Sequence, residues 1–217
     1  RGAAVRRDVL KGPAQRRVDV VDHLRHRRLR VIAVVDAHAD DAVALLWLAQ
    51  LARAGEIELC GVTTCAGNST ARTTYDLAGR VLTLAGMVLQ SVSRGIGEES
   101  HQMDDGFHGE DGMGGVANLL PSWKPPPHPA SSRQILADQL RNGGRTVLCL
   151  APLTNLAALE RNNPGILALA SEIVCMVGAF GHPGNITASA EFNAWWDPEA
   201  LDVVLRSGAR VVMMPLD

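Results

Sequence analysis

The sequence lacks three features that would each indicate a broad class of protein. Its four cysteines lack the Cys-x-x-Cys spacing of a structural zinc site or a redox pair, so we expect buried thiols in a reducing compartment. Its 21 basic and 23 acidic residues give a formal charge of −2, which provides no net positive field to attract nucleic acid. No apolar run approaches the roughly 18 residues that span a bilayer. Small molecules are therefore the expected partners.

The first 30 residues differ from the rest because they are rich in Arg and contain no Ser. We interpret residues 1–30 as a poorly ordered N-terminal extension of the folded domain. Reduced thiols favour a cytoplasmic location, while an Arg-rich, acid-poor leader leaves organellar targeting open, although transit peptides are usually Ser-rich as well. The chain begins with Arg and stops after a strand-like segment at Asp217. We therefore expect an incomplete C-terminus.

Short apolar strings alternate with helical stretches over residues 31–217. This alternation predicts one α/β domain with an open, mostly parallel sheet and helices on both faces. A Gly-, His- and Pro-containing segment, residues 94–130, interrupts the pattern and is expected to be a functional or mobile loop. The expected strands are 30–36, 57–65, 145–151, 172–179 and 209–217, and the expected helices are 41–55, 69–86, 131–144, 154–166 and 197–208.

Polar residues follow the apolar strings in positions that should converge. In open parallel sheets, ligands bind beyond the carboxyl ends of the strands. Four such residues arrive from separate strands and are expected to line one crevice: Asp36, Asn68, Thr154 and Asn185.

Three carboxylates, those of Asp36, Asp40 and Asp41, lie where the first strand ends and the first helix begins. Helix capping explains one Asp at such a position. Three carboxylates this close repel one another unless a cation lies among them, and ligation by oxygen alone selects calcium or magnesium. The cluster therefore favours a cation, with capping as the alternative.

His38 lies inside this cluster and raises a second hypothesis. The string "AHADD" is similar to the "AHPDD" of zinc-dependent N-acetylglucosaminyl deacetylases, in which His and Asp bind zinc. The Pro is missing here, Ala42 replaces an acidic residue, and no His-x-x-His ligand pair follows. Apart from this zinc-deacetylase alternative, we expect His38 to be solvent-exposed and incidental.

Five segments carry a resemblance to one family. "VVDAHADD", "GVTTCAGNST", "HGEDGMGG", "LAPLTNLA" and "GAFGHPGNITASAEFNAWWDPEA" resemble, in the same order, motifs of the nucleoside hydrolases, the inosine-uridine preferring N-ribohydrolases. The last segment is similar to the family's "GGAFxxxGNxTPxAEFNxxxDPEA" almost residue for residue. The first departs from the family's D-x-D-P-G-x-D-D, because Val34, Ala37 and His38 replace its first Asp, its Pro and its Gly.

The resemblance implies a fold with a Rossmann-like core that holds one calcium ion beneath the ribose of a nucleoside. It implies hydrolysis of the N-glycosidic bond to ribose and free base by a calcium-activated water, in purine and pyrimidine salvage, and commonly a homo-oligomer. Asp36 and Asp41, with the backbone carbonyl of Thr154, would be calcium ligands, and Asp36 would also be the catalytic base. The implied ribose-binding residues are Asp40, Asn68, Asn185, Glu191 and Asn193.

Several alternatives remain open at this point. The protein is either such a hydrolase or a truncated or decayed relative that binds nucleoside or ribose weakly without catalysis. Glu191 and Asn193 would otherwise cap a helix from a polar loop. His108 would belong to a lid or to a Gly-rich surface turn. Trp195 and Trp196 would stack on a base or fill the core.

Overall fold

The computed structural model describes residues 28–67, 69–87, 92–93, 108–109 and 111–217. Residues 1–27, which make up most of the expected N-terminal extension, lie outside the described residues. Asn68 and much of the interrupting segment, residues 94–107, also lie outside them.

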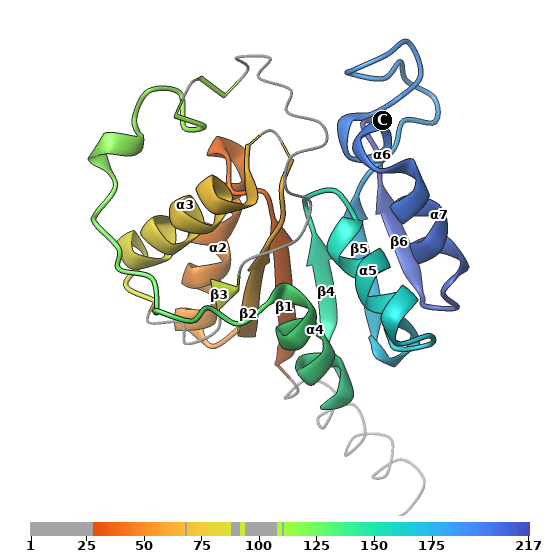
Figure 1. Cartoon of the computed structure of the whole chain (residues 1–217), viewed down its shortest axis with the longest axis horizontal. Coiled ribbons are helices and arrows are strands. Elements are labelled where there is room, and N and C mark those ends of the chain that lie inside the picture. Colours follow the sequence, from red (N-terminus) through yellow and green to blue (C-terminus); the bar gives the residue numbers. More distant parts are fainter. Residues whose placement is uncertain (1–27, 68, 88–91, 94–107, 110) are drawn as a thin grey trace, which may run out of the picture.

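A six-stranded parallel sheet with the order β3-β2-β1-β4-β5-β6 forms the centre of the molecule (Figure 1). All five predicted strands are present, which confirms the predicted sheet. The short β3 was not predicted, because two residues are too few to show an alternating pattern. The strands are β1 (Leu29–Val35), β2 (Ile57–Thr64), β3 (Val92–Ser93), β4 (Thr146–Cys149), β5 (Glu172–Met176) and β6 (Val211–Met214).

The helices follow the predicted segments and end where local chemistry stops them. Gly55, in the left-handed conformation (φ 75°), ends the helix Ala39–Ala54. Ser131 and Gln134 form a capping box at the start of the helix Ser132–Arg141. The helices are α2 (Ala39–Ala54), α3 (Ala71–Leu84), α4 (Ser132–Arg141), α5 (Thr154–Asn162), α6 (Phe192–Trp196) and α7 (Pro198–Arg206), with 3₁₀ turns at Ala117–Leu119 and Leu167–Leu169.

Helices cover both faces of the sheet, as the apolar pattern of β1 requires. Ile32 and Val34 pack with α4, α5 and α7 in one buried cluster. Val31, Ala33 and Val35 pack with α2 and α3 in another. Because successive side chains of a strand point to opposite faces, one strand contributes to both cores. Burying side chains on both faces fixes the position of β1 in the centre of the sheet.

The order of the strands places a crevice at the tip of β1. This strand pairs with β2 on one side and with β4 on the other, so the chain reverses its direction of travel across the sheet between them. Parallel α/β sheets bind ligands at such a switch point. The polar residues that follow β1, β4 and β5 lie at this edge.

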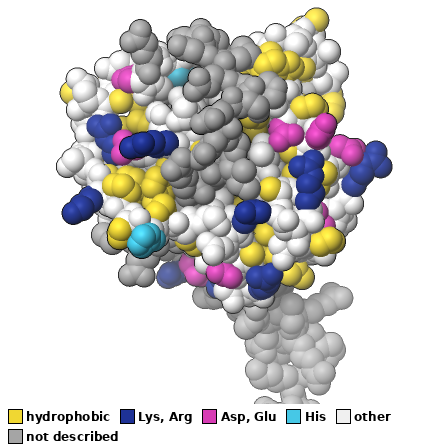
Figure 2. Space-filling model, in the orientation of Figure 1, with side chains coloured by type: hydrophobic (Ala, Val, Ile, Leu, Met, Phe, Trp, Pro, Cys, Tyr) yellow, Lys and Arg dark blue, Asp and Glu magenta, His cyan; other side chains and the backbone are white. Residues whose placement is uncertain are grey.

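The burial of three of the four cysteines agrees with the compositional expectation. Cys65, Cys149 and Cys175 are buried free thiols, and Cys60 is half-buried. None of the helices in the described part of the chain has both the length and the apolar character needed to cross a membrane. On the face drawn in Figure 2, basic and acidic side chains are interspersed among the described residues.

Candidate functional site

The tip of β1 brings together the aspartates that the sequence singled out. Asp36 follows the strand directly, and its backbone N–H donates to Asp41 Oδ2 at 3.1 Å. The Asp41 N–H in turn donates to Asp40 Oδ1 at 3.1 Å. Asp36 and Asp41 are buried, whereas Asp40 is exposed. Both carboxylates in the first turn of α2 therefore accept backbone N–H groups, but the N-cap residue is His38 and its side chain makes no capping hydrogen bond.

Capping does not account for the charge of this cluster. Burial, and then the neighbouring Asp36 carboxylate, raise the pKa of Asp41 well above its ordinary value. Two buried carboxylates in contact are therefore unfavourable when both are ionised. A cation between them would remove the repulsion.

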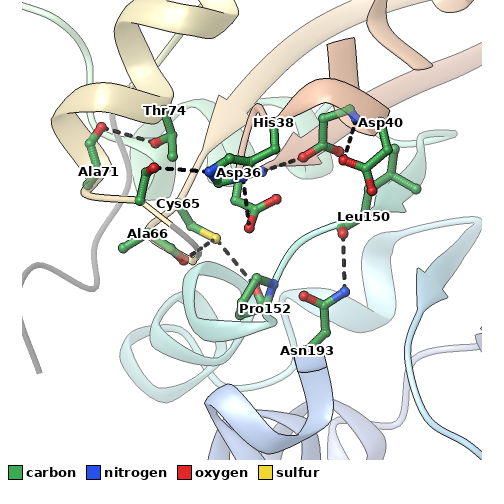
Figure 3. A network of polar contacts seen from close by, with 12 residues as sticks. Asp36, His38, Asp40, Cys65, Ala66, Ala71, Thr74, Leu150, Pro152 and Asn193 are labelled. Atoms are coloured by element: carbon green, nitrogen blue, oxygen red, sulfur yellow. Dashed lines mark hydrogen bonds and ion pairs between the residues drawn. The ribbon is translucent and has the colours of Figure 1, made fainter. Parts of the chain in front are cut away.

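His38 is buried, so the expectation that it is solvent-exposed and incidental was wrong. Only 1% of its surface is exposed, and its ring stacks on His108 with centroids 4.7 Å apart. Its Nε2 lies 3.0 Å from Ser69 Oγ, and its Nδ1 lies 3.5 Å from Asp36 Oδ2 (Figure 3). This burial was not predictable from the sequence, because both ring contacts, Ser69 and His108, come from residues distant in the chain.

The backbone between Asp36 and His38 has a conformation that is uncommon for its residue type. Ala37 has a φ of 55°, the only positive φ of a non-glycine residue in the described segments, and it is fully buried. Such a conformation costs a non-glycine residue about 1–3 kcal/mol and is most often found at functional sites. Gly67, at the end of β2, lies so close that a Cβ atom there would be 2.9 Å from Asp36 Cγ. Both neighbours therefore restrict where the Asp36 side chain can lie.

A cavity of about 230 Å³ joins this cluster to the C-terminal part of the chain. Five of the six residues expected to act on the substrate line it, and the sixth, Asn68, lies outside the described residues. The lining residues are Asp36, Asp40, His108, Leu150, Met176, Asn185, Ile186, Glu191, Phe192 and Asn193. The structure therefore brings the expected base and the expected ribose-binding side chains to one space.

Hydrogen bonds to the backbone hold the polar wall of this cavity in place. Asn193 Nδ2 donates to the carbonyls of Leu150 and Met176, at the ends of β4 and β5. Asn185 Oδ1 accepts the Phe192 N–H at 2.8 Å. Within the described part of the chain, Asn185 Nδ2 and Asn193 Oδ1 have no hydrogen-bond partner. One donor and one acceptor are thus available at the cavity.

Glu191 caps the short helix α6, which the sequence did not predict as a helix. Its Oε1 accepts the Asn193 N–H, and its Oε2 accepts the N–H groups of Gly178 and Ala194. The side chain is almost fully buried. The capping interpretation of "AEFN" is therefore confirmed, and it coexists with a place at the cavity.

Thr154, whose backbone carbonyl was expected to join the carboxylates as a metal ligand, keeps that role as a prediction. It begins α5, and its hydroxyl donates to Asp197 Oδ2 at 2.7 Å. Thr154 is absent from the residues that line the cavity, whereas Leu150, at the end of β4, lines it. Figure 3 shows the Leu150 carbonyl in the same space as Asp36 and Asn193. The Leu150 carbonyl is thus a backbone oxygen at the cavity, where it accepts a hydrogen bond from Asn193 Nδ2.

The segment around His108 folds against the same cavity through one carboxylate. Asp111 Oδ1 accepts the N–H groups of Met113 and Gly115, and its Oδ2 accepts that of Ala117. These hydrogen bonds lower the pKa of Asp111, so its carboxylate stays ionised, and the turn stays closed, below the ordinary value near 3.9. His108 is thereby held beside His38, a role that neither the lid nor the surface-turn hypothesis had specified.

The residues present fit a divalent cation. One oxygen of Asp36, one oxygen of Asp41 and one ring nitrogen of His38 lie within 4.8 Å of one another, and all three side chains are buried. Burial and then the Asp36 carboxylate raise the pKa of Asp41, so the ionised cluster lacks compensating charge, and His38 Nδ1 is buried without a hydrogen-bond partner. A cation would supply that compensation.

Comparison with known proteins gives one consistent match. The family model of the inosine-uridine preferring nucleoside hydrolases matches residues 31–217. A pyrimidine-specific ribonucleoside hydrolase of Shewanella is 36% identical over 198 residues, which are 86% of this chain and 58% of the relative.

Two solved structures are also similar. A plant nucleoside hydrolase aligns with a TM-score of 0.78 at 30% identity and covers 88% of this chain and 60% of its own. A purine-preferring ribonucleoside hydrolase from Gardnerella vaginalis aligns with a TM-score of 0.77 at 27% identity, covering 86% and 60%. The chain thus spans about 60% of the length of these relatives.

Proposed function

Because the chain belongs to the inosine-uridine preferring nucleoside hydrolase family, we propose that the protein hydrolyses the N-glycosidic bond of ribonucleosides to ribose and free base. The observation that carries this proposal is the cavity that joins Asp36 and Asp40 to the polar wall of Asn185, Glu191 and Asn193. Breaking this bond passes through a sugar with oxocarbenium character. The site must therefore hold the sugar by its hydroxyls and place carboxylates near the developing positive charge.

Asp36 is the proposed base that accepts a proton from the attacking water. It lies at the tip of β1, lines the cavity, and is confined by Ala37 and Gly67. A general base contributes about 10²- to 10⁴-fold to the rate when it is held within reach of the proton. Confinement of its side chain supplies that positioning without the entropy cost of ordering it at each turnover.

Asp40 and the asparagines are the proposed sugar contacts. A diol presents donors and acceptors together, and the cavity offers the Asn185 Nδ2 donor, the Asn193 Oδ1 acceptor and the exposed Asp40 carboxylate. Asn68 is proposed as a further contact on the resemblance alone, and Glu191 as the group that positions Asn193 and the start of α6.

A divalent cation held by Asp36 and Asp41 is part of this proposal. When bound, such an ion would acidify water and bind sugar oxygens directly. Calcium is the ion that two carboxylates and a backbone carbonyl alone would favour.

A relative that binds nucleosides without catalysis is the second candidate. It is favoured by the departures from the family motif at Val34, Ala37 and His38. Ala37 in particular has a left-handed φ, which a Pro at this position could not adopt. The backbone of the opening motif therefore differs here in conformation as well as in composition.

One experiment separates these candidates. The chain is incubated separately with inosine and with uridine, each in the presence of zinc or calcium, and free ribose is measured alongside the thermal unfolding midpoint. A purine nucleoside (inosine) and a pyrimidine nucleoside (uridine) are both needed, because one relative is named pyrimidine-specific and another purine-preferring. Ribose release supports the enzyme. Nucleoside-dependent stabilisation without ribose supports the binding protein, and absence of both results rejects the site.

A further inference from the structure

His38 presents a buried ring nitrogen to the acidic cluster. The side chain is 1% exposed, and its Nδ1 makes no hydrogen bond in the described structure, although Asp36 Oδ2 lies 3.5 Å away. A buried polar atom without a partner costs about 1–3 kcal/mol. Such an atom beside two carboxylates suggests that something else satisfies it.

The contact on the other side of the ring is compatible with the tautomer that a metal ligand needs. Ser69 Oγ lies 3.0 Å from Nε2 and can accept a hydrogen bond from an Nε2–H group, and in that tautomer the Nδ1 lone pair points away from Ser69. A second hydrogen bond of this kind commonly orients histidines that bind metals. The stacked His108 ring further limits rotation of His38. The imidazole is therefore held as a ligand would be.

The separation of the donor atoms fits an ion of zinc size. Zinc–oxygen and zinc–nitrogen bonds of about 2.0–2.2 Å in tetrahedral geometry place two ligand atoms about 3.3–3.5 Å apart. Asp36 Oδ2 and His38 Nδ1 are 3.5 Å apart, and one Asp41 oxygen lies within 4.8 Å of an Asp36 oxygen and of a His38 ring nitrogen. Three protein ligands with an open fourth position is the arrangement of catalytic zinc sites.

We propose that His38 Nδ1 is a metal ligand together with Asp36 and Asp41, and that this nitrogen makes the site prefer zinc to calcium. Imidazole suits zinc and neighbouring transition metals, whereas calcium takes oxygen ligands. The inference concerns the same site as the proposed function but deepens it by naming the ion. Its test needs no nucleoside, so its failure can be distinguished from failure of the proposed function.

The test is metal competition on the full, untagged chain, followed by X-ray absorption at the zinc edge. The stripped protein is dialysed against equal zinc and calcium, and the bound metal is measured. We expect about one zinc per chain, with the outer-shell scattering of one imidazole ring. Bound calcium in preference to zinc, or a zinc shell without imidazole, would overturn the proposal. The second result is what a protonated His38 paired with Asp36 would give.

Two substitutions and a control sharpen the test. His38→Gly should remove the imidazole scattering and lower the zinc preference by more than the roughly 10-fold that loss of an outer-shell partner costs. Ser69→Ala keeps the ring but should weaken zinc binding about 10- to 100-fold. His128→Ala alters an exposed histidine and should change neither measurement. Equal zinc binding by His38→Gly and His128→Ala would contradict the assignment. If His38→Gly does not fold, the zinc affinity of Ser69→Ala and the X-ray absorption spectrum of the wild type still test whether His38 binds the ion.

Discussion

Asp41 is the single residue whose charge the fold tolerates least. Its folded-state pKa lies above the unfolded value near 3.9. The metal-free protein therefore loses stability as the pH rises from the unfolded pKa of Asp41 through its folded pKa. The substitution Asp41→Asn removes that loss and keeps an oxygen for the Asp36 N–H. We expect the metal-free melting temperature to rise by about 2–4 °C for each kcal/mol of repulsion removed.

The same substitution should abolish most of the stabilisation that a divalent cation gives the wild type, because one charged ligand is lost. Asp202→Asn, at an exposed acid that pairs with Arg206 on α7, is the matched control and should change neither quantity. A lower melting temperature for metal-free Asp41→Asn would show that the two carboxylates do not repel in the fold.

Glu191 matters to the fold through its two oxygens. In Glu191→Gln, one oxygen is replaced by an NH₂ group, which cannot accept the Asn193 N–H in one orientation of the amide or those of Gly178 and Ala194 in the other. Leaving a buried donor without an acceptor costs about 1–3 kcal/mol, so urea unfolding should show at least this loss. Glu199→Gln, at an exposed position in the first turn of α7, should cost less than about 1 kcal/mol. Similar losses in both variants would argue against the capping role.

Single residues also show where sequence reasoning succeeds. Asp36 and Asp40 were predicted because three acids next to a strand end are unusual in themselves. The environment of His38 was not predicted, because Ser69 and His108 are distant from it in the sequence and contact it only in the folded chain. The contact of the Leu150 carbonyl with Asn193 was not predicted, because the identity of a side chain gives no signal for what its backbone carbonyl accepts.

At the scale of elements, the junction between β1 and α2 depends on a left-handed residue. Ala37→Pro would restore the residue of the family pattern, yet it should destabilise the protein by more than about 1 kcal/mol, because Pro cannot adopt a φ of 55°. Ala39→Pro is the matched control, since Ala39 is the first residue of α2, where Pro is tolerated, and the preceding His38 is already extended. Chemical unfolding compares them. An Ala37→Pro variant as stable as Ala39→Pro would show that the junction adopts another backbone conformation.

The turn of residues 111–117 is a second element that one side chain organises. Asp111→Asn keeps one acceptor oxygen and should expose the Ala117 amide, while Asp111→Ala should expose the amides of Met113, Gly115 and Ala117 together. Hydrogen exchange resolved by residue measures this graded response. Unchanged exchange at all three amides in Asp111→Ala would mean that the turn closes without the carboxylate.

The elements also show what an apolar pattern can reveal. The strands and long helices were predicted correctly because their hydrophobic period is visible over several residues. The helix α6 was missed because its five residues follow an irregular polar stretch, and its start is fixed by Glu191 accepting N–H groups from two segments. Short elements held by tertiary hydrogen bonds leave little trace in the sequence.

At the scale of the whole molecule, the strand order explains why distant segments meet. The crevice beside β1 is lined by Asp36 from the start of the domain and by Asn185 and Asn193 from its end, about 150 residues later. These residues meet because the carboxyl ends of parallel strands lie at the same edge of the sheet. The sequence predicted this convergence from the fold class alone. It could not predict how far each side chain reaches.

The central claim is that Asp36, beside a bound cation, drives hydrolysis of a ribonucleoside in this crevice. The most direct measurement is the release of free ribose from inosine and uridine by wild type, Asp36→Asn and the control Asp202→Asn, with zinc or calcium added to the stripped protein. The account predicts ribose release by wild type and by Asp202→Asn, and a loss of about 10²- to 10⁴-fold in Asp36→Asn. Equal release by Asp36→Asn and wild type, or no release with no nucleoside-dependent stabilisation, would contradict it.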